Sequence, residues 1–199
     1  MSLPKLKRRR GRYAGWKLLV LAVVIVSSGL YMLLLTAAPY VVPIDKTAVE
    51  TALKNRPAIK ENRLYIPEMG VNVPINEIVN GNDAQALFNG AAHRAAQSGN
   101  PKDGGNFVLA AHRFSLGITP GNVVQKSPFF HIDRLKVKDL VYVDWLGERY
   151  TYRINSLSSV APTQVSIEAR TALPQLTFYS CGLGGERDNR IVAMAKPVE

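Results

Sequence analysis

An uncharged run of 21 residues near the N-terminus limits most strongly what this chain can fold into. The run reads LLVLAVVIVSSGLYMLLLTAA and extends from Leu18 to Ala38. As a helix with a rise of about 1.5 Å per residue, it is long enough to cross a hydrocarbon core of roughly 30 Å. Seven Lys and Arg residues precede it, and no acidic residue occurs before Asp45. Because basic flanks stay on the cytoplasmic side, we expect a single-pass cell-membrane anchor with a cytoplasmic N-terminus and everything after Pro39 outside the cell.

A cleaved signal peptide is the alternative interpretation of this run. The letters TAA at its end resemble a small-residue cleavage site. The apolar cores of cleaved signals, however, usually span about 7 to 15 residues. The length of the run therefore favours a retained anchor.

Composition indicates one globular domain behind the anchor. The 199 residues are 47% hydrophobic and 20% charged, which fits a single domain with one appended segment. Most of the net charge of +10 comes from the seven basic residues among the first 17, so a basic face on the domain and a nucleic-acid partner are not expected. The chain divides into a basic cytoplasmic tail (1–17), a transmembrane anchor (18–38), a linker (39–60) and a folded domain (61–199).

Short β-branched and aromatic runs dominate the domain. The linker before it contains a helical pattern, DKTAVETALKNR from Asp45 to Arg56, which Pro57 ends. From Leu64 onward, Gly, Pro, Asn and Asp separate seven strand-like runs: LYIP, VNVPI, NFVLAAH, DLVYVDW, RYTYRINSL, LTFYSC and RIVAMA. Seven or eight short strands with little long helix predict a mainly β fold. It is either an antiparallel sandwich or a closed barrel, and closure would remove exposed strand edges.

Cys181 is the only cysteine of the chain. Exported proteins normally use cysteines in pairs, so a single one indicates an intermolecular bond or a reactive thiol. A buried cysteine acting as a small hydrophobic residue is the simplest alternative. Its position argues for reactivity, because Cys181 ends an apolar run and meets the glycine-rich loop GLGGERDN, where sites are commonly built.

A nucleophilic thiol needs a partner that accepts its proton. His112 follows NFVLAA and should end a strand, so it can meet Cys181 if the two strands run side by side in parallel. His93 lies in the polar stretch NGAAHRAAQSG and is expected at the surface. His131 in SPFFHIDRLKV is expected to be a packing or turn residue. His112 is therefore the candidate acid and base.

Arg190 is the third candidate site residue. In a hairpin, Cys181 and Arg190 flank the same connecting loop, so their side chains can converge on one cleft. Arg187 is nearer the tip of the loop and is expected to face water. An ordinary solvated arginine is the alternative interpretation of Arg190.

Four segments in order resemble the sortases, a family of membrane-anchored cysteine transpeptidases, over roughly Leu64 to Val198. RLYIPEMGVNVPI resembles the opening strands of the family, GGNFVLAAHR the segment that ends in its catalytic histidine, LTFYSC its Thr-Leu-x-Thr-Cys motif, and NRIVAMA the strand that opens with its essential arginine. Ala111, Phe178 and Ser180 depart mildly from the family pattern, and none of them replaces a reacting group. The resemblance implies catalytic roles for His112, Cys181 and Arg190.

The resemblance also implies a fold and a reaction. The fold would be a closed eight-stranded β-barrel with short helices, and residues 61–199 would be its catalytic domain. Cys181 would cleave an LPXTG-like sorting signal through a thioester, and an amine on a cell-wall precursor or a pilin lysine would accept the protein. The segment VAPTQVSIEARTALPQ stands where the family has a substrate-recognition loop. No metal cluster or phosphate-binding loop is evident, so no cofactor is expected.

Two other classes of protein are weighed against this interpretation. An L,D-transpeptidase-like enzyme also pairs cysteine with histidine outside the cell, but it usually places histidine, glycine and arginine close around the cysteine, a cluster that TFYSCGLGG lacks. A non-catalytic, membrane-tethered binding barrel would need neither a reactive thiol nor a nearby histidine.

Overall fold

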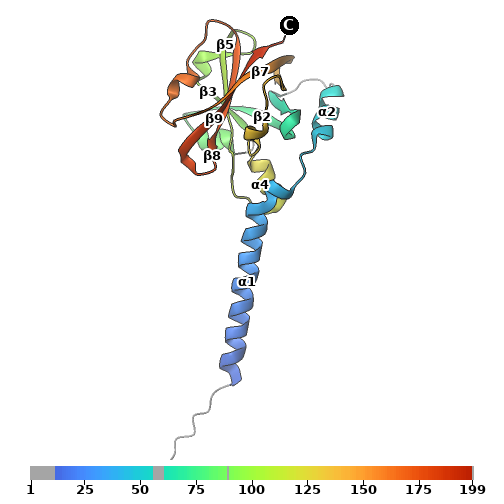
Figure 1. Ribbon diagram of the computed structural model, residues 1–199, viewed down its shortest axis with the longest axis vertical. Helices are drawn as coiled ribbons and strands as arrows, with labels where there is room; N and C mark the ends of the chain where they lie inside the picture. Colours follow the sequence, from blue (N-terminus) through green and yellow to red (C-terminus); the bar gives the residue numbers. More distant parts are fainter. Residues whose placement is uncertain (1–11, 56–60, 89, 199) are drawn as a thin grey trace, which may run out of the picture.

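A long N-terminal helix leads into a domain built mainly of strands (Figure 1). The computed structural model describes residues 12–55, 61–88 and 90–198. Within them the helices are α1 (Arg12–Val41), α2 (Lys46–Lys54), α3 (Asp83–Leu87) and α4 (Pro120–Lys126), and the 3₁₀ helices are η1 (Pro67–Met69), η2 (Ala96–Ser98), η3 (Ile132–Arg134) and η4 (Val165–Glu168). The strands are β1 (Arg63–Ile66), β2 (Val71–Glu77), β3 (Ala91–Arg94), β4 (Gly99–Asn100), β5 (Gly104–Ala110), β6 (Leu140–Trp145), β7 (Glu148–Val160), β8 (Gln175–Gly182) and β9 (Gly185–Pro197).

The helix α1 extends beyond the predicted anchor of residues 18–38 on both sides. Its stretch Gly15–Val41 is long and apolar enough to cross a membrane, and most of that stretch lies outside the packed domain. Most of the predicted basic tail, residues 1–11, lies outside the described residues. The structure thus has one N-terminal apolar helix that fits a membrane anchor.

The predicted helix in the linker is confirmed and shorter than expected. The carboxylate of Asp45 accepts a hydrogen bond from the backbone of Ala48 at 2.9 Å, which caps the first turn of α2. At the other end, the guanidinium of Arg149 donates to the carbonyl of Leu53 at 2.8 Å while it pairs with Asp144. The helix is therefore attached to the turn between β6 and β7. Arg56 and Pro57, predicted to end the helix, lie outside the described residues.

Within the described residues, eight strands close into a barrel. The strands follow the order β3, β2, β1, β6, β7, β9, β8, β5, and a pairing of β3 with β5 closes the ring, while the short β4 is attached to β5 alone. The neighbours are antiparallel except for β2 with β3 and β5 with β8, which are parallel. The closed barrel replaces the open alternative of a sandwich and removes unpaired strand edges.

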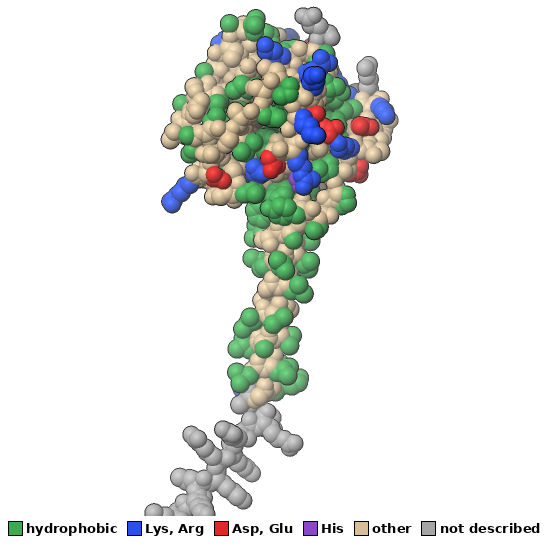
Figure 2. All heavy atoms as spheres, viewed as in Figure 1, with side chains coloured by type: hydrophobic (Ala, Val, Ile, Leu, Met, Phe, Trp, Pro, Cys, Tyr) green, Lys and Arg blue, Asp and Glu red, His purple; other side chains and the backbone are tan. Residues whose placement is uncertain are grey.

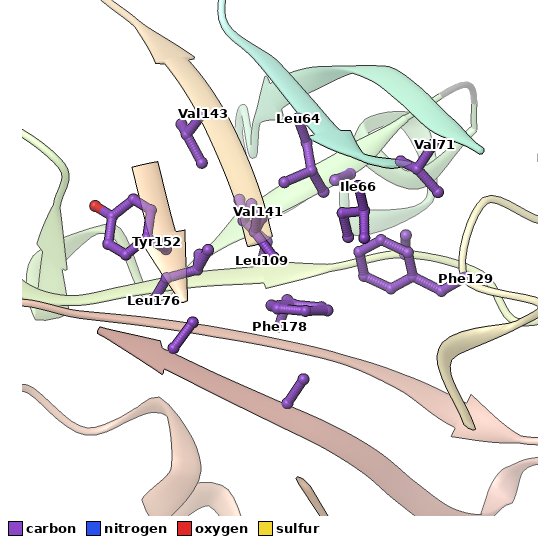
Figure 3. Close-up of a cluster of buried hydrophobic side chains, with 14 of the residues drawn as sticks. Leu64, Ile66, Val71, Leu109, Phe129, Val141, Val143, Tyr152, Leu176 and Phe178 are labelled. Carbon is purple, nitrogen blue, oxygen red and sulfur yellow. The ribbon is translucent and has the colours of Figure 1, made fainter. Parts of the chain in front are cut away.

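The interior of the barrel is filled by side chains from almost every strand. Figure 3 shows Leu64 and Ile66 of β1, Leu109 of β5 and Phe178 of β8 pointing toward one another, and each of these side chains is fully buried. They recur at alternate positions because successive side chains of a strand point to opposite faces. On β8 this alternation turns Phe178 and Ser180 inward and leaves Tyr179 and Cys181 half-buried on the outer face.

The expectation that His93 lies at the surface is wrong. It belongs to β3, the residue is only 4% exposed, and its ring packs edge-on against Phe107 and Trp145. Its Nδ1 lies 2.9 Å from a carboxylate oxygen of Glu77, and its Nε2 lies 3.2 Å from the carbonyl oxygen of Gly99. The strand β3 has only four residues, two of them alanines, and so carries little strand signal of its own. Its pairing with β2 and β5, rather than its local sequence, makes it a strand.

Candidate active site

Cys181 lies at the end of β8, where the strand leaves the barrel. It is half-buried, and since the chain has a single cysteine it cannot form an internal disulfide. The preceding side chain, Ser180, is 2% exposed on the inner face. The alternation of the strand therefore turns the thiol away from the core and toward the surface.

His112 follows the strand beside Cys181. The condition for their meeting, that the two strands run side by side in parallel, is met, because Ala110 of β5 pairs with Tyr179 of β8 and the backbone of Ala111 donates to the carbonyl of Tyr179 at 3.3 Å. His112 and Cys181 each follow that pair by two residues, so His112, just past the end of β5, comes beside the end of β8 that carries Cys181. The carbonyl of His112 also accepts a hydrogen bond from the backbone of Phe129 at 3.1 Å, which holds its position from the other side.

Burial sets the charge state of His112. Desolvation lowers the pKa of its imidazole below the ordinary value, and the nearby carboxylate of Glu186 acts in the opposite direction. The ring is therefore neutral at neutral pH. A neutral imidazole has one nitrogen free to accept a proton.

Arg190 stands directly opposite Cys181 across the β8–β9 ladder. Directly opposed residues of an antiparallel pair project from the same face of the sheet. The Nη1 of Arg190 donates to the carbonyls of Glu186 and Asp188 at 3.0 and 2.9 Å, so the guanidinium is held against the first residues of its own strand, next to the β8–β9 turn. Arg187, in the first part of β9 after the turn, is exposed, as predicted.

The carboxylate of Asp188 shapes the loop next to Cys181. It accepts backbone hydrogen bonds from Gly184 at 3.0 Å and from Asn189 at 2.7 Å. These bonds, with the positive charges of Arg113 and Arg190 nearby, lower the pKa of Asp188 below its usual range. A Cβ at Gly182 would collide with this carboxylate, so a larger residue directly after Cys181 would force the Asp188 side chain to move.

Arg113 is a buried charge that sequence reasoning missed. It follows His112, its side chain is 8% exposed, and its Nη2 lies 2.8 Å from a carboxylate oxygen of Asp133. Its Nε has no hydrogen-bond partner among the described residues. The sequence offers one signal, since HR interrupts an otherwise apolar stretch, but nothing in it indicates that the arginine is buried.

The connection between β7 and β8, residues 161–174, is attached to the strand that carries Cys181. Its Glu168 accepts from the hydroxyl of Tyr179 on β8 and from the guanidinium of Arg94 on β3. The burial of Tyr179 and its bond to Glu168 raise the pKa of that phenol. Glu168 therefore ties this loop to the outer face of the strand that carries Cys181.

The buried side-chain amide of Asn106 on β5 also holds the β7–β8 loop. The Nδ2 of Asn106 donates to the carbonyls of Ile167 and Ala169, both at 2.9 Å, and its Oδ1 accepts from the hydroxyl of Thr177 at 2.7 Å. Asn106 is 1% exposed and lies in the apolar strand β5. A polar residue inside an apolar strand was a signal for this role, because buried amides are hydrogen-bonded.

All three predicted site residues lie at the end of the barrel that faces α1. In Figure 1 the C-terminal end of β9 lies on the far side of the domain from α1, so the start of β9, with Arg190 opposite Cys181, lies on the near side. The helix α4, which follows His112 in the chain, lies at the junction with α1 (Figure 1). Strand pairing thus gathers residues that are up to 78 positions apart in the chain.

The architecture is similar to that of solved sortase structures. The structure is similar to that of a Clostridium perfringens sortase D5 transpeptidase, with a TM-score of 0.56 and 22% sequence identity. The similarity covers 77% of this chain and 89% of that one. Sortase C-1 from Actinomyces oris matches with a TM-score of 0.58 and 22% identity over 81% of this chain and 86% of that one. Sortase E1 from Streptomyces coelicolor, solved with a tripeptide in the active site, matches with a TM-score of 0.56 and 24% identity over 70% of this chain and 88% of that one. These likenesses show the fold. No curated protein matches the chain by sequence.

The sequence itself matches the family model described as the sortase domain over residues 64–198, which include the barrel from the second residue of β1 onward and the three predicted site residues. This match covers more than half of the chain and agrees with the fold. It favours the transpeptidase interpretation over an L,D-transpeptidase-like enzyme or a non-catalytic barrel. An eight-stranded barrel with a half-buried cysteine at one end, behind an apolar helix, is thus a sortase domain, and the chain belongs to the sortase family.

Proposed function

We propose that this protein is a cysteine transpeptidase in which Cys181 is the nucleophile, His112 the acid and base, and Arg190 the group that stabilises the oxyanion. The single observation that carries the proposal is the register of β8. Its last residues pair on one side with the strand before His112 and on the other side with Arg190. One strand end thus lies between a proton acceptor and a fixed positive charge, as acyl transfer to a thiol requires.

The first half of the reaction forms a thioester. Neutral His112 takes the proton of the Cys181 thiol, and the thiolate attacks the carbonyl carbon after the threonine of an LPXTG-like sorting signal. Arg190 stabilises the resulting oxyanion. Its bonds to Glu186 and Asp188 use only Nη1, whereas a guanidinium has five N–H donors. The carbon–nitrogen bond then breaks, and His112 returns its proton to the departing amine.

The second half of the reaction transfers the acyl group to an amine. His112, again neutral, removes a proton from the incoming amine, which attacks the thioester carbonyl. The carbon–sulfur bond breaks, an amide bond forms, and Cys181 recovers its proton. The acceptor is an amine of a cell-wall precursor or the lysine of a pilin. Every proton that His112 takes is returned, so the cycle needs no cofactor.

The anchor supports a location for this chemistry. The basic residues before Leu18 favour a cytoplasmic N-terminus, and the helix α1 then carries residues 61–199 outside the cell. Protease added to intact cells should cleave the domain and leave a fragment that contains α1. Complete protection of the chain in intact cells would contradict this topology.

The central experiment incubates the full chain, in detergent micelles, with a panel of sorting-signal peptides and an amine. Mass spectrometry should detect an acyl adduct on Cys181 and a new amide product after the amine is added. Cys181→Ala should remain folded, because it removes one sulfur atom at a half-buried site, and should give neither species. Product formation by Cys181→Ala, or an adduct on another residue, would assign the chemistry elsewhere.

A further inference from the structure

The C-terminal part of α1 packs against the segment that follows His112. Leu35 and Ala38 of α1 are 3% and 1% exposed and form a small apolar cluster with Val123 of α4. The hydroxyl of Tyr31 donates to the carbonyl of Ile118, and the ring of Tyr40 meets the ring of Phe130 edge-on at 4.8 Å. The helix is therefore in contact with this segment over several turns.

The segment Phe114–Gln125, here called the anchor-side loop, carries no charged residue. It exposes three large apolar side chains at alternate positions: Phe114 is 37%, Leu116 47% and Ile118 79% exposed. Figure 2 shows hydrophobic side chains gathered on the underside of the domain, where α1 joins it. A contiguous exposed apolar surface on a soluble domain marks an interaction site.

Three backbone N–H groups of the anchor-side loop are paired with side chains of the loop or of Ser127 just after it. The side chain of Asn122 accepts from the backbone of Ile118 at 3.3 Å, Thr119 caps the backbone of Asn122 at 3.2 Å, and the hydroxyl of Ser127 accepts from the backbone of Ser115 at 2.9 Å. These bonds matter because backbone groups that enter a bilayer cannot bond to water and must find partners in the protein.

The helical rise places the anchor-side loop at the level of the membrane. Tyr31 lies 14 residues after Lys17, which corresponds to about 21 Å along the helix. With Lys17 at the inner boundary of a hydrocarbon core roughly 30 Å thick, Tyr31 lies about 9 Å below the outer boundary. Ile118, whose carbonyl accepts from the hydroxyl of Tyr31, then lies within the length of a tyrosine side chain of that depth. Moving Tyr31 up to the boundary would pull the backbone of Lys17 into the core, and its charge would have to reach back to the inner interface.

We propose that the anchor-side loop inserts Leu116 and Ile118 into the outer leaflet of the bilayer that α1 spans. This inference rests on the topology of the proposed function, with the domain on the outer side of a retained anchor. It goes beyond that topology, because the domain itself becomes a membrane-contacting element. The loop starts directly after His112, and the bond from Phe129 to the carbonyl of His112 closes it, so the site is held at the level of the lipid headgroups.

The test uses the full chain with Cys181→Ala and one new cysteine that carries an environment-sensitive fluorophore. The labelled variants are Ile118→Cys and Leu116→Cys in the loop, Val26→Cys in the middle of α1, and Leu146→Cys, whose side chain is 67% exposed in the β6–β7 turn at the opposite end of the barrel. Each variant is reconstituted into zwitterionic lipid vesicles with and without lipids that carry a nitroxide quencher on the acyl chain.

The expected result is a blue-shifted emission and loss of fluorescence to the quencher at positions 118, 116 and 26, with no quenching at position 146. Quenching at position 26 without quenching at 118 and 116 would overturn the insertion of the loop and leave the anchor intact. Absence of quenching at position 26 would overturn the anchoring itself and, with it, the inference. Equal quenching at 146 and 118 would mean that the domain lies on the bilayer without a preferred face, which also overturns the inference.

Discussion

The strand ends that carry the candidate site and the two loops that border it are held by different forces. Cys181, His112 and Arg190 are positioned by backbone pairing within one sheet. The anchor-side loop depends on apolar packing against α1, whereas the β7–β8 loop depends on buried polar tethers from β3, β5 and β8. Changes at the strand ends should therefore affect the chemical step, and changes at each loop should affect only that loop.

The largest effect should separate two histidines of opposite character. His112→Ala should lower kcat by about 10²-fold or more, the usual scale for losing a proton-transfer group, with little change in thermal stability. His93→Ala should instead leave Glu77 and Gly99 without their buried partner and lower the stability by about 1–3 kcal/mol. Its kcat, measured well below its melting temperature, should stay near normal.

Steady-state transpeptidation and thermal denaturation of the same preparations check this pair of histidines. Loss of turnover by His93→Ala without loss of stability would show that the chemistry depends on His93 rather than on His112. Normal turnover by His112→Ala would remove His112 from the mechanism.

The second effect separates two arginines of the β8–β9 hairpin. Arg190→Ala should lower kcat by about 10² to 10³, the usual cost of one oxyanion donor. Arg190→Lys keeps the charge but lacks the planar fork of donors, so it should also be strongly impaired. Arg187→Ala is the matched control, because this side chain lies three residues before Arg190 on the same strand and is exposed, so the variant should have nearly normal activity.

The arginine pair is compared at matched stability, because Arg190 also bonds to the carbonyls of Glu186 and Asp188. A fall in melting temperature that accounts for the whole loss of turnover would make Arg190 a residue that supports the hairpin. Near-normal turnover in both Arg190 variants would exclude it from oxyanion stabilisation.

A third prediction concerns the β7–β8 loop. Asn106→Asp keeps the size of the side chain but cannot donate to the carbonyls of Ile167 and Ala169. It should lower the free energy of unfolding by about 1–3 kcal/mol, raise KM, and speed tryptic cleavage after the exposed Arg170. Asn155→Asp, at an exposed position of β7, is the control for the added charge.

Cleavage after Lys126, next to the anchor-side loop, serves as the internal reference for the third prediction. If the β7–β8 loop and the anchor-side loop are held independently, Asn106→Asp should leave the rate of cleavage after Lys126 unchanged. Equal acceleration at Arg170 and Lys126 would mean that the variant loosens the whole barrel rather than one loop.

Sequence alone predicted the parts of the molecule whose signals are local. The seven strand-like runs and the capped helix after Asp45 carry their own periodicity, and the solitary Cys181 stood out by its position. The parallel pairing of the strands before His112 and at Cys181 was predicted as a condition and is confirmed. Their catalytic roles remain predictions.

The parts that sequence missed depend on partners far away in the chain. The strand β3 has four residues and exists through its neighbours, so neither the strand nor the burial of His93 could be inferred from the polar stretch around it. Two tethers of the β7–β8 loop join residues 61 and 74 positions apart, namely Asn106 with Ile167 and Arg94 with Glu168. Such contacts follow only from the closed barrel.

The smallest effect should come from Glu186, which separates the electrostatics of the hairpin from its backbone structure. Burial lowers the pKa of His112, and the carboxylate of Glu186 partly opposes that shift. Glu186→Gln removes the opposing charge but keeps the carbonyl that binds Arg190, so the pKa of His112 should fall further. Since the neutral imidazole must accept the thiol proton, activity should persist to lower pH, and the acid limb of the kcat/KM profile should move toward acid.

The sign for stability follows from the same shift. A histidine whose pKa is lower when folded binds fewer protons in the folded state, so its neutral form supports folding above the unfolded pKa of about 6.5, and this contribution is lost as the pH falls below that value. Glu186→Gln should make the acid-side loss of stability slightly larger. Glu50→Gln, an exposed carboxylate on α2, changes the net charge equally and should shift neither curve. An acid limb that moves toward neutral pH in Glu186→Gln, or that moves equally in both variants, would show that the titration seen in catalysis is not that of His112.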